Sequence, residues 1–308
     1  MSTVVDATAT QDAAARQPAE VLAYYPGCSL HGTEPEYDES LRAVVEALGV
    51  AIAEIPDWNC CGASSAHGEG HLLSTGLPGR NILLAEQMGL DIAVPCAACY
   101  NRLAVANAEM RSDPGLAEKV SGVVGLQFQG TSDVRPLVDI IVNDVGLEAI
   151  GARVRRPLEG LKVACYYGCL LVRPPRVLGF DDADEPMTMD NLVTALGGEP
   201  VTWPHKTECC GASFSLTRVD VVQKMTGDVL RMARDCGANC VVCACPLCMT
   251  NLDMRQGGIE SLTGEKIGLP IFYFTELLAL AMGLDMVKSC WKMHFVSPEP
   301  LLRETAAV

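Results

Sequence analysis

The sequence predicts an α/β fold, a tandem duplication of an α/β unit with a small, mainly parallel sheet and pseudo-two-fold related halves. Two observations predict this fold class. The order strand, helix, strand, helix, strand, helix occurs twice along the 308 residues. A pattern of five cysteines also occurs twice, and its members follow the ends of predicted strands. Because binding sites gather at the carboxyl edge of parallel α/β sheets, we expect the cysteines to form sites there.

In the first copy the predicted strands are residues 21–25, 50–55 and 91–95. The helix predicted between the first two strands has apolar residues at the i, i+3, i+4, i+7 spacing and ends at Gly49: Leu41, Val44, Val45 and Leu48. Residues 71–88 predict a helix that is broken or restarted near Pro78, and a further helix is expected from Ala97 to Arg111. Residues 112–160 have a weaker pattern, with a helical segment near 134–145.

The second copy repeats this order. Its predicted strands are residues 161–167, 199–203 and 240–244, and its predicted helices are 188–196, 216–236 and a segment that ends near Gln256. A final strand at 271–274 and helix at 275–282 have no evident counterpart in the first copy. We therefore expect an N-terminal tail at 1–20, a first domain at 21–150, a linker at 151–160, a second domain at 161–290 and a C-terminal tail at 291–308.

Composition excludes several classes of function. The formal net charge is −15, and binding to a nucleic-acid backbone depends on clustered Lys and Arg, so we expect no nucleic-acid partner. No apolar run reaches about 18 residues, so no membrane span is expected. The first twenty residues lack the basic and apolar regions of a secretory signal. We therefore expect a cytoplasmic protein, in a compartment where cysteine clusters indicate metal or redox work.

Ten of the fifteen cysteines belong to the repeated pattern of one cysteine, a Cys-Cys-Gly and a Cys-x-x-Cys. In both copies 34 residues separate the doublet from the closing pair, whereas the gap before the doublet is 31 residues in the first copy and 39 in the second. The first set is Cys28, Cys60, Cys61, Cys96 and Cys99. The second set is Cys169, Cys209, Cys210, Cys245 and Cys248.

Five sulfur donors in each copy favour iron and sulfur over zinc. Four thiolates close a tetrahedral zinc site, and an ordinary cubane 4Fe-4S cluster also takes four. Adjacent cysteines in extended or loop backbone project in different directions, which suits a cluster with separate irons better than a single ion. Either one cysteine per copy is a bystander, or the cluster is open. Zinc in both copies, or zinc in the first copy alone, remains an alternative.

These motifs resemble the CCG domain, and two of them in one chain, opened by Tyr-Tyr-Pro-Gly-Cys and Tyr-Tyr-Gly-Cys, resemble the B subunit of heterodisulfide reductase. The resemblance covers about residues 21–285. It implies two noncubane 4Fe-4S clusters, with the first set of five cysteines holding one cluster and the second set holding the other. It also implies that a small disulfide or thiol substrate is reduced or formed between the two clusters.

The resemblance implies partners as well, because the sequence has no nucleotide-binding fingerprint or ferredoxin-type motif of its own. The partners expected are a ferredoxin-like C subunit with two 4Fe-4S clusters and a flavin-containing A subunit. His67 and His205 lie within about ten residues of a motif cysteine and are candidates for giving a proton to a departing thiolate. The alternative function is an electron-relay subunit of a dehydrogenase or sulfur-oxidation complex, with no substrate of its own.

Overall fold

The computed structural model describes residues 21–63 and 65–305, so the predicted tail at 1–20 lies outside the described residues. The chain forms two four-stranded parallel sheets with the same strand order. The first sheet has the order β2-β1-β3-β4, with β1 at Leu22–Tyr24, β2 at Ile52–Glu54, β3 at Ile92–Val94 and β4 at Val134–Pro136. The second has the order β6-β5-β7-β8, with β5 at Lys162–Tyr166, β6 at Glu199–Pro200, β7 at Cys240–Cys243 and β8 at Ile271–Tyr273. The predicted duplicated α/β fold is thus confirmed.

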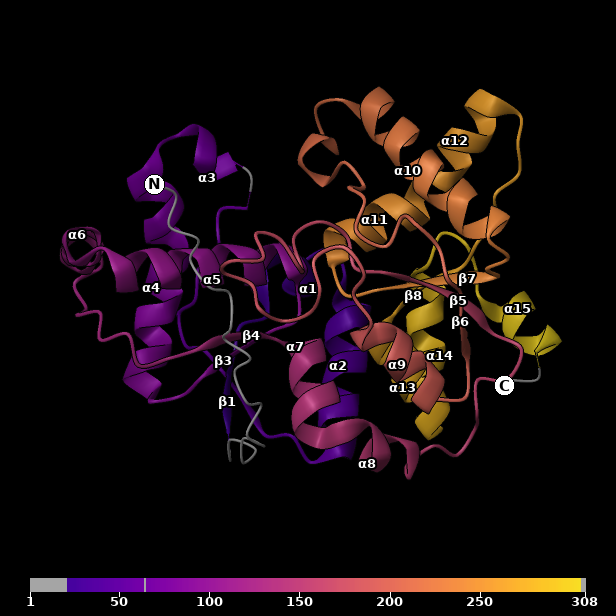
Figure 1. Cartoon of the computed structure of the whole chain (residues 1–308), viewed down its shortest axis with the longest axis horizontal. Coiled ribbons are helices and arrows are strands. Elements are labelled where there is room, and N and C mark those ends of the chain that lie inside the picture. The colour runs from indigo at the N-terminus through magenta and orange to yellow at the C-terminus, as the bar shows by residue number, and fades with distance from the viewer. Residues whose placement is uncertain (1–20, 64, 306–308) are drawn as a thin grey trace, which may run out of the picture.

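Helices cover both sheets, as Figure 1 shows. In the first half they are α1 (Gly27–His31), α2 (Pro35–Leu48), α3 (Ser65–Gly68), α4 (His71–Met88), α5 (Ala97–Ser112), α6 (Pro114–Val124), α7 (Leu137–Asp139), the π-helix η1 (Ile140–Gly146) and α8 (Leu147–Gly151). In the second half they are α9 (Thr188–Ala195), the 3-10 helix η2 (Ala212–Phe214), α10 (Val219–Asp235), α11 (Pro246–Met254), α12 (Gln256–Thr263), α13 (Phe274–Met282), α14 (Val287–Cys290), the 3-10 helix η3 (Trp291–Met293) and α15 (Glu299–Glu304).

Burial follows the position of a strand in its sheet, with one exception. The central strands β1, β3 and β7 are buried throughout and β5 is buried after its first residue, as expected for parallel strands that are covered on both faces, whereas β8 is an edge strand that is nevertheless fully buried. The edge strand β2 is half-buried to exposed. The connecting helix α2 turns its apolar face to the core and ends at Gly49, whose φ of 77° is the left-handed conformation that favours glycine at a helix end.

Two expectations about the first half are wrong. Residues 134–145 are not one helix, because 134–136 pair with β3 as the fourth strand before α7 and η1 begin. Therefore β8 and α13 do have counterparts in the first half, namely β4 and the α7–η1 segment. Helix α4 is also continuous through Pro78, where a break was expected. Its Gly79 lies against α6, where an added Cβ would be 3.0 Å from Val120, so the helix is held by close packing.

Each half packs the helices that follow its last strand against the other half. Helix α13, which follows the last strand of the second half, packs along α2 of the first half. In the reciprocal arrangement, α7 and α8 of the first half pack against α9 of the second. Figure 1 shows α2, α7, α9 and α13 together between the two sheets. Each half therefore completes the cover of the other, and the relative position of the two sheets is set by buried helix contacts.

Residues 291–305, predicted as a C-terminal tail, continue the folded chain. Trp291 is buried in η3, and Leu302 is fully buried in α15. Between them Asp253 accepts hydrogen bonds from the backbone N–H groups of Phe295 and Val296, at 2.7 and 2.9 Å. Among the residues that the structure describes, no helix combines the length and the apolar character needed to cross a membrane.

Candidate functional site

In both halves the cysteines lie where the parallel strands end. Cys28 follows β1 at the start of α1, the Cys60–Cys61 doublet lies in the loop after β2, and Cys96 caps the N-terminus of α5 after β3. The second half repeats this placement with β5, β6, β7 and α11. Because the carboxyl ends of parallel strands meet at one edge, all five thiols of each half are brought together there.

A tyrosine holds each doublet loop in the same way. The Tyr25 hydroxyl donates to the carbonyl oxygen of Asn59, directly before the first doublet, at 2.9 Å. The Tyr166 hydroxyl donates to the carbonyl oxygen of Glu208, directly before the second doublet, at 2.6 Å. Each tyrosine stands two residues before a glycine that precedes the first cysteine of its set. This shared spacing was the signal in the sequence that could have identified them as site residues.

Glycines make room for the closing cysteine of each set. An added Cβ at Gly27 would lie 3.2 Å from the Cys99 sulfur, and one at Gly168 would lie 3.3 Å from the Cys248 sulfur. Both glycines also have positive φ, at 72° and 65°. The chain after the first strand can therefore approach the last thiol only without a side chain.

The thiols of the first half stand in a row. The Cys28 and Cys60 sulfurs are 3.7 Å apart, and those of Cys61 and Cys99 are 3.4 Å apart. Cys60 also interacts with Cys61, and Cys99 with Cys96. The five side chains are thus in contact from the exposed Cys28 to the buried Cys96.

The second half has the same contacts with one gap. The Cys210 and Cys248 sulfurs are 3.7 Å apart, and Cys248 interacts in turn with Cys245. Cys169 and Cys209 form a separate interacting pair beside them. Cys169 and Cys209 are half-buried, whereas the other three are buried, so here too one end of the set lies nearer to solvent.

The two rows meet between the halves. The Cys96 thiol of the first set interacts directly with Cys245 of the second set. The backbone N–H of Ala98, at the start of α5, also donates to Cys245. The N-terminus of a first-half helix therefore contributes to the second set of sulfurs, and the ten thiols form one region that crosses from one half to the other.

Hydrogen bonds between thiols shift their pKa values in opposite directions. The Cys169 thiol holds the pKa of Cys209 at about 6, and donation from Cys28 lowers the pKa of Cys60. Donation from Cys248 and Cys96 lowers the pKa of the buried Cys245. Each half thus has a thiol that loses its proton more readily than an isolated cysteine, and binding of a metal displaces the protons of the remaining thiols.

The arrangement of the donors fits a group with several metal atoms. Two ligands of one tetrahedral ion with bonds of about 2.3 Å lie about 3.8 Å apart, close to the sulfur pairs seen here. Each pair could therefore bind one metal atom by itself. In the described part of the chain, however, no three His, Cys, Asp or Glu side chains converge on one metal position, as a complete site for a single ion would require. Five sulfur donors in each half therefore fit an iron-sulfur cluster better than a single zinc ion.

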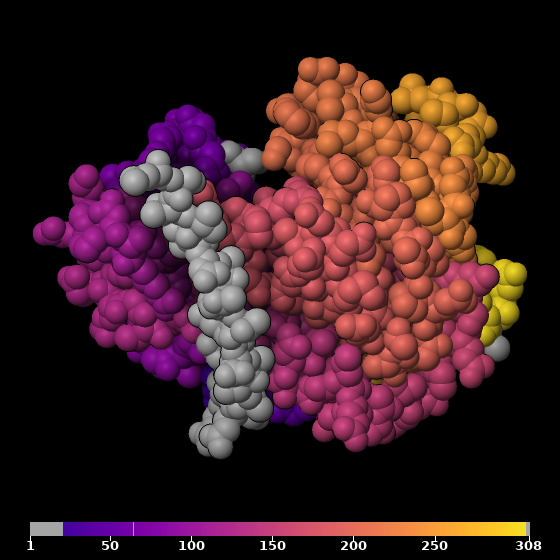
Figure 2. Space-filling model, viewed as in Figure 1, coloured from indigo at the N-terminus to yellow at the C-terminus, as the bar shows by residue number. Residues whose placement is uncertain are grey.

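Figure 2 shows a notch between two lobes of the surface, near α3 of the first half and near α10 of the second. In each half, the chain enters this lobe directly after the Cys-Cys doublet. Helix α3 begins four residues after Cys61, and η2, which precedes α10, begins two residues after Cys210. His67 in α3 is exposed, and burial together with the Arg102 charge lowers its pKa. His205 is half-buried, and its Nδ1 is buried without a hydrogen-bond partner among the described residues.

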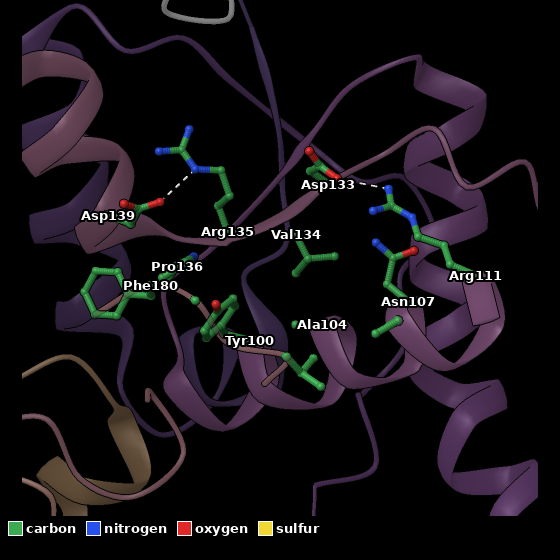
Figure 3. A pocket seen from close by; sticks show the side chains of 13 residues that line it. Tyr100, Ala104, Asn107, Arg111, Asp133, Val134, Arg135, Pro136, Asp139 and Phe180 are labelled. Atoms are coloured by element: carbon green, nitrogen blue, oxygen red, sulfur yellow. Dashed lines mark hydrogen bonds and ion pairs between the residues drawn. The ribbon is translucent and has the colours of Figure 1, made fainter. Parts of the chain in front are cut away.

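Five cavities in the described part of the chain lie away from the sulfurs. The pocket in Figure 3, of about 380 Å³, lies between α5, β4 and the loop that contains Phe180. Its arginines are already paired, since Arg111 binds Asp133 and Arg135 binds Asp139. A more apolar cavity of about 760 Å³ lies along α4 and α6. None of these five cavities has a motif cysteine in its wall.

Two parallel α/β halves that each bring five cysteines to the carboxyl edge define a duplicated cysteine-rich protein. The cysteine-rich domain family named CCG matches residues 22–104 and 163–253. The chain belongs to the family of heterodisulfide reductase B subunits, with two copies of this domain. This membership makes it an iron-sulfur protein of the oxidoreductase class.

Individual relatives cover most of the chain. It is 34% identical over 266 residues to the 8-methylmenaquinol:fumarate reductase membrane anchor subunit of Wolinella succinogenes. This match covers 85% of this chain and 92% of the relative. It is 30% identical over 272 residues to the B subunit of the ferredoxin/F(420)H(2)-dependent CoB-CoM heterodisulfide reductase of Methanosarcina acetivorans, covering 86% and 90%. A solved structure of a hypothetical protein from Helicobacter pylori has the same fold, with a TM-score of 0.70 and 10% identity, over 91% of this chain and 53% of that one.

Proposed function

We propose that this chain is the catalytic iron-sulfur subunit of a heterodisulfide reductase-like complex, in which a disulfide is reduced, or reversibly formed, between two noncubane 4Fe-4S clusters. The observation that carries the proposal is the contact between Cys96 and Cys245, which joins the two sulfur sets across the halves. A chain that only stored two separate metals would not need its two sites in contact.

The ligands proposed for the first cluster are Cys28, Cys60, Cys61, Cys96 and Cys99. Those proposed for the second are Cys169, Cys209, Cys210, Cys245 and Cys248. When bound, the clusters supply one-electron transfer and iron positions that accept sulfur. Zinc in place of the first cluster is the minor alternative, and we keep 21–150 and 161–290 as the proposed domains.

The protein's own residues orient and shield the site. Tyr25 and Tyr166 fix the doublet loops, and buried residues of β3 and β7 exclude water behind the closing cysteines. His67, six residues after the first doublet, and His205, four residues before the second, are the proposed proton donors to a departing thiolate. His205 is the stronger candidate, because its buried Nδ1 has no partner among the described residues and a substrate atom could supply one.

The electrons are proposed to come from a ferredoxin-like C subunit with two 4Fe-4S clusters, and through it from a flavin-containing A subunit, in the cytoplasm. The support is the family itself, which includes the B subunits of ferredoxin-dependent reductases. Two clusters that each hand over one electron would match the two electrons needed to break a disulfide, so that no free sulfur radical leaves the site.

A second candidate is an electron-relay subunit of a quinol-linked reductase with no substrate of its own. One observation favours it. The relative with 34% identity is named as a subunit of an 8-methylmenaquinol:fumarate reductase.

Anaerobic purification followed by metal analysis and a disulfide assay tests both candidates. Two four-iron clusters require ~8 Fe per chain, and a disulfide reductase should oxidise reduced viologen with a small disulfide as the acceptor. Replacing Cys245 with Ser should abolish this turnover, whereas Cys236→Ser, at the C-terminal end of α10 and outside both cysteine sets, should keep it. Full iron without any disulfide turnover would favour the relay, and zinc without iron would contradict both candidates.

A further inference from the structure

An asparagine beside the sulfurs of the second half has no counterpart in the first half. In the second half, Asn251 stands three residues after the closing Cys248 and faces the doublet. Its Nδ2 donates to the carbonyl oxygen of Cys210 at 3.1 Å and lies 3.6 Å from the Cys210 sulfur. Its Oδ1 accepts a hydrogen bond from the Ser215 hydroxyl at 2.8 Å. Asn251 is therefore a neutral side chain whose polar groups are satisfied within its own half.

In the first half the same position, three residues after Cys99, is Arg102. The position that corresponds to Ser215, five residues after the second cysteine of the doublet, is Ala66, which has no hydroxyl to offer. The Nε of Arg102 is buried and has no hydrogen-bond partner among the described residues. The first half thus has a charged arginine with this free N–H donor at the position where the second half has a neutral, fully hydrogen-bonded asparagine.

Arg102 lies in α5, three residues after Cys99 of the first set, on the helix that reaches the second half through Asn101. Burial lowers the pKa of its guanidinium, and negative charge on Cys61 and, to a smaller extent, on Cys169 raises it. Its neighbour Asn101 confirms the closeness of the second half, because its Nδ2 donates to the carbonyl oxygens of Leu170 and Arg173 at 3.3 and 2.7 Å. Arginine remains protonated in proteins, so this is a fixed positive charge.

A fixed cation favours reduction of the cluster that it faces, because each added electron increases the negative charge of that cluster. The first set is also the more exposed of the two, because Cys28 and Cys60 are open to solvent. Water stabilises the added negative charge, so this exposure also favours reduction of the first cluster. Hydrogen bonds from neutral groups such as Asn251 act more weakly than a full charge.

We propose that Arg102 makes the first cluster the stronger electron acceptor of the two, so that the paired sites have unequal reduction potentials and electrons pass from the second set toward the first. This inference rests on the proposed presence of two clusters. It does not depend on whether the chain cleaves a disulfide or relays electrons. Arg102 acts through the cluster, so it is a positioning residue.

Potentiometric titration of the intact, iron-loaded protein, followed by EPR and visible absorption, measures the two potentials directly. Replacing Arg102 with Gln should lower the higher potential by about 59 mV or more, a tenfold change for one electron. Arg102→Lys should retain most of the potential, because it keeps the charge. Lys119→Gln, which removes an exposed positive charge from α6 of the same half, is the matched control and should leave both potentials unchanged.

A Cys209→Ser and Cys210→Ser double variant assigns the signals, since it should retain only the first cluster and the higher potential. The inference is overturned if this variant retains the lower potential, if Arg102→Gln leaves the higher potential in place, or if Lys119→Gln changes it equally. Loss of iron in Arg102→Gln would also overturn it, because the arginine would then be needed for assembly. Absence of two clusters from the unaltered protein would instead contradict the proposed function itself.

Discussion

Tyr37 of the first half stacks on Tyr273 of the second, with ring centroids 3.9 Å apart and planes within 6° of parallel. Both hydroxyls are used, since Tyr37 donates to the carbonyl oxygen of Pro95 at 3.0 Å and Tyr273 donates to Glu34 at 2.9 Å. Pro95 directly precedes Cys96. The stacked pair therefore links the packing of the two halves to the point where the two sulfur sets meet.

Replacing Tyr273 with Ala should destabilise the protein by roughly 3–5 kcal/mol, because a fully buried aromatic ring is lost and Glu34 loses a donor. Chemical denaturation monitored by circular dichroism measures this change. The control is Phe214→Ala, whose ring is 47% exposed and which should change stability by less than about 0.5 kcal/mol. Equal losses in the two variants would mean that the stacked pair does not hold the halves together.

A comparison of Gly27 with Gly49 separates two effects of adding a side chain, the strain of a positive φ and the steric contact with the Cys99 sulfur. Gly27→Ala and Gly49→Ala both place a side chain at positive φ, 72° and 77°, and should each cost about 1–2 kcal/mol. Only at Gly27 does the new Cβ meet a sulfur, that of Cys99, whereas nothing lies within 4 Å at Gly49. We therefore expect iron analysis to show a loss of about half the iron in Gly27→Ala and none in Gly49→Ala. Full iron in both variants would show that the approach to Cys99 is not needed for assembly.

Lys206, three residues before the second doublet, is buried. Its Nζ lies 2.9 Å from Asp190, and both side chains are about 5% exposed or less. Lys206→Met should destabilise the protein by roughly 3–5 kcal/mol, because it leaves the Asp190 charge buried and unpaired. The exposed pair of Arg218 and Asp220 is the comparison, since Arg218→Met should cost less than about 1 kcal/mol. A small effect of Lys206→Met in urea unfolding would contradict this prediction.

Stability should fall as the pH rises, because of His294. Burial lowers its pKa, but Glu276, 2.9 Å away, raises it further, with help from Asp253 and Glu36, to about 9. Since the unfolded pKa is near 6.5, the stabilisation is fully present below about pH 6.5 and is lost by about pH 9. The expected loss is up to about 3 kcal/mol.

Urea unfolding at pH 6, 8 and 10 measures this loss. His294→Gln can still donate a hydrogen bond to Glu276 but has no charge to lose, so its stability should vary less over the same range. A parallel decline in the two proteins would assign the pH dependence to other groups.

Most of the helices and strands could be predicted from the sequence, because the spacing of apolar residues within a short segment is enough to indicate its conformation. The strands that precede the cysteines and the helices that come after them were found close to their true bounds. The short strand β4 was missed because three residues, one of them Arg135, have no alternating pattern, while the apolar residues after it have helical spacing. Its pairing with β3 decides its conformation, and β3 is forty residues away.

The duplication, the ten cysteines and their positions at strand ends are properties of the sequence alone, because local spacing determines where each strand stops and which residues come next. Only the tertiary structure decided that Cys96 contacts Cys245, that α13 covers α2, and that Lys206 and Arg102 are placed as they are. These contacts join residues far apart in the chain. They depend on which apolar faces each half leaves uncovered for the other, and no local pattern in either half specifies that.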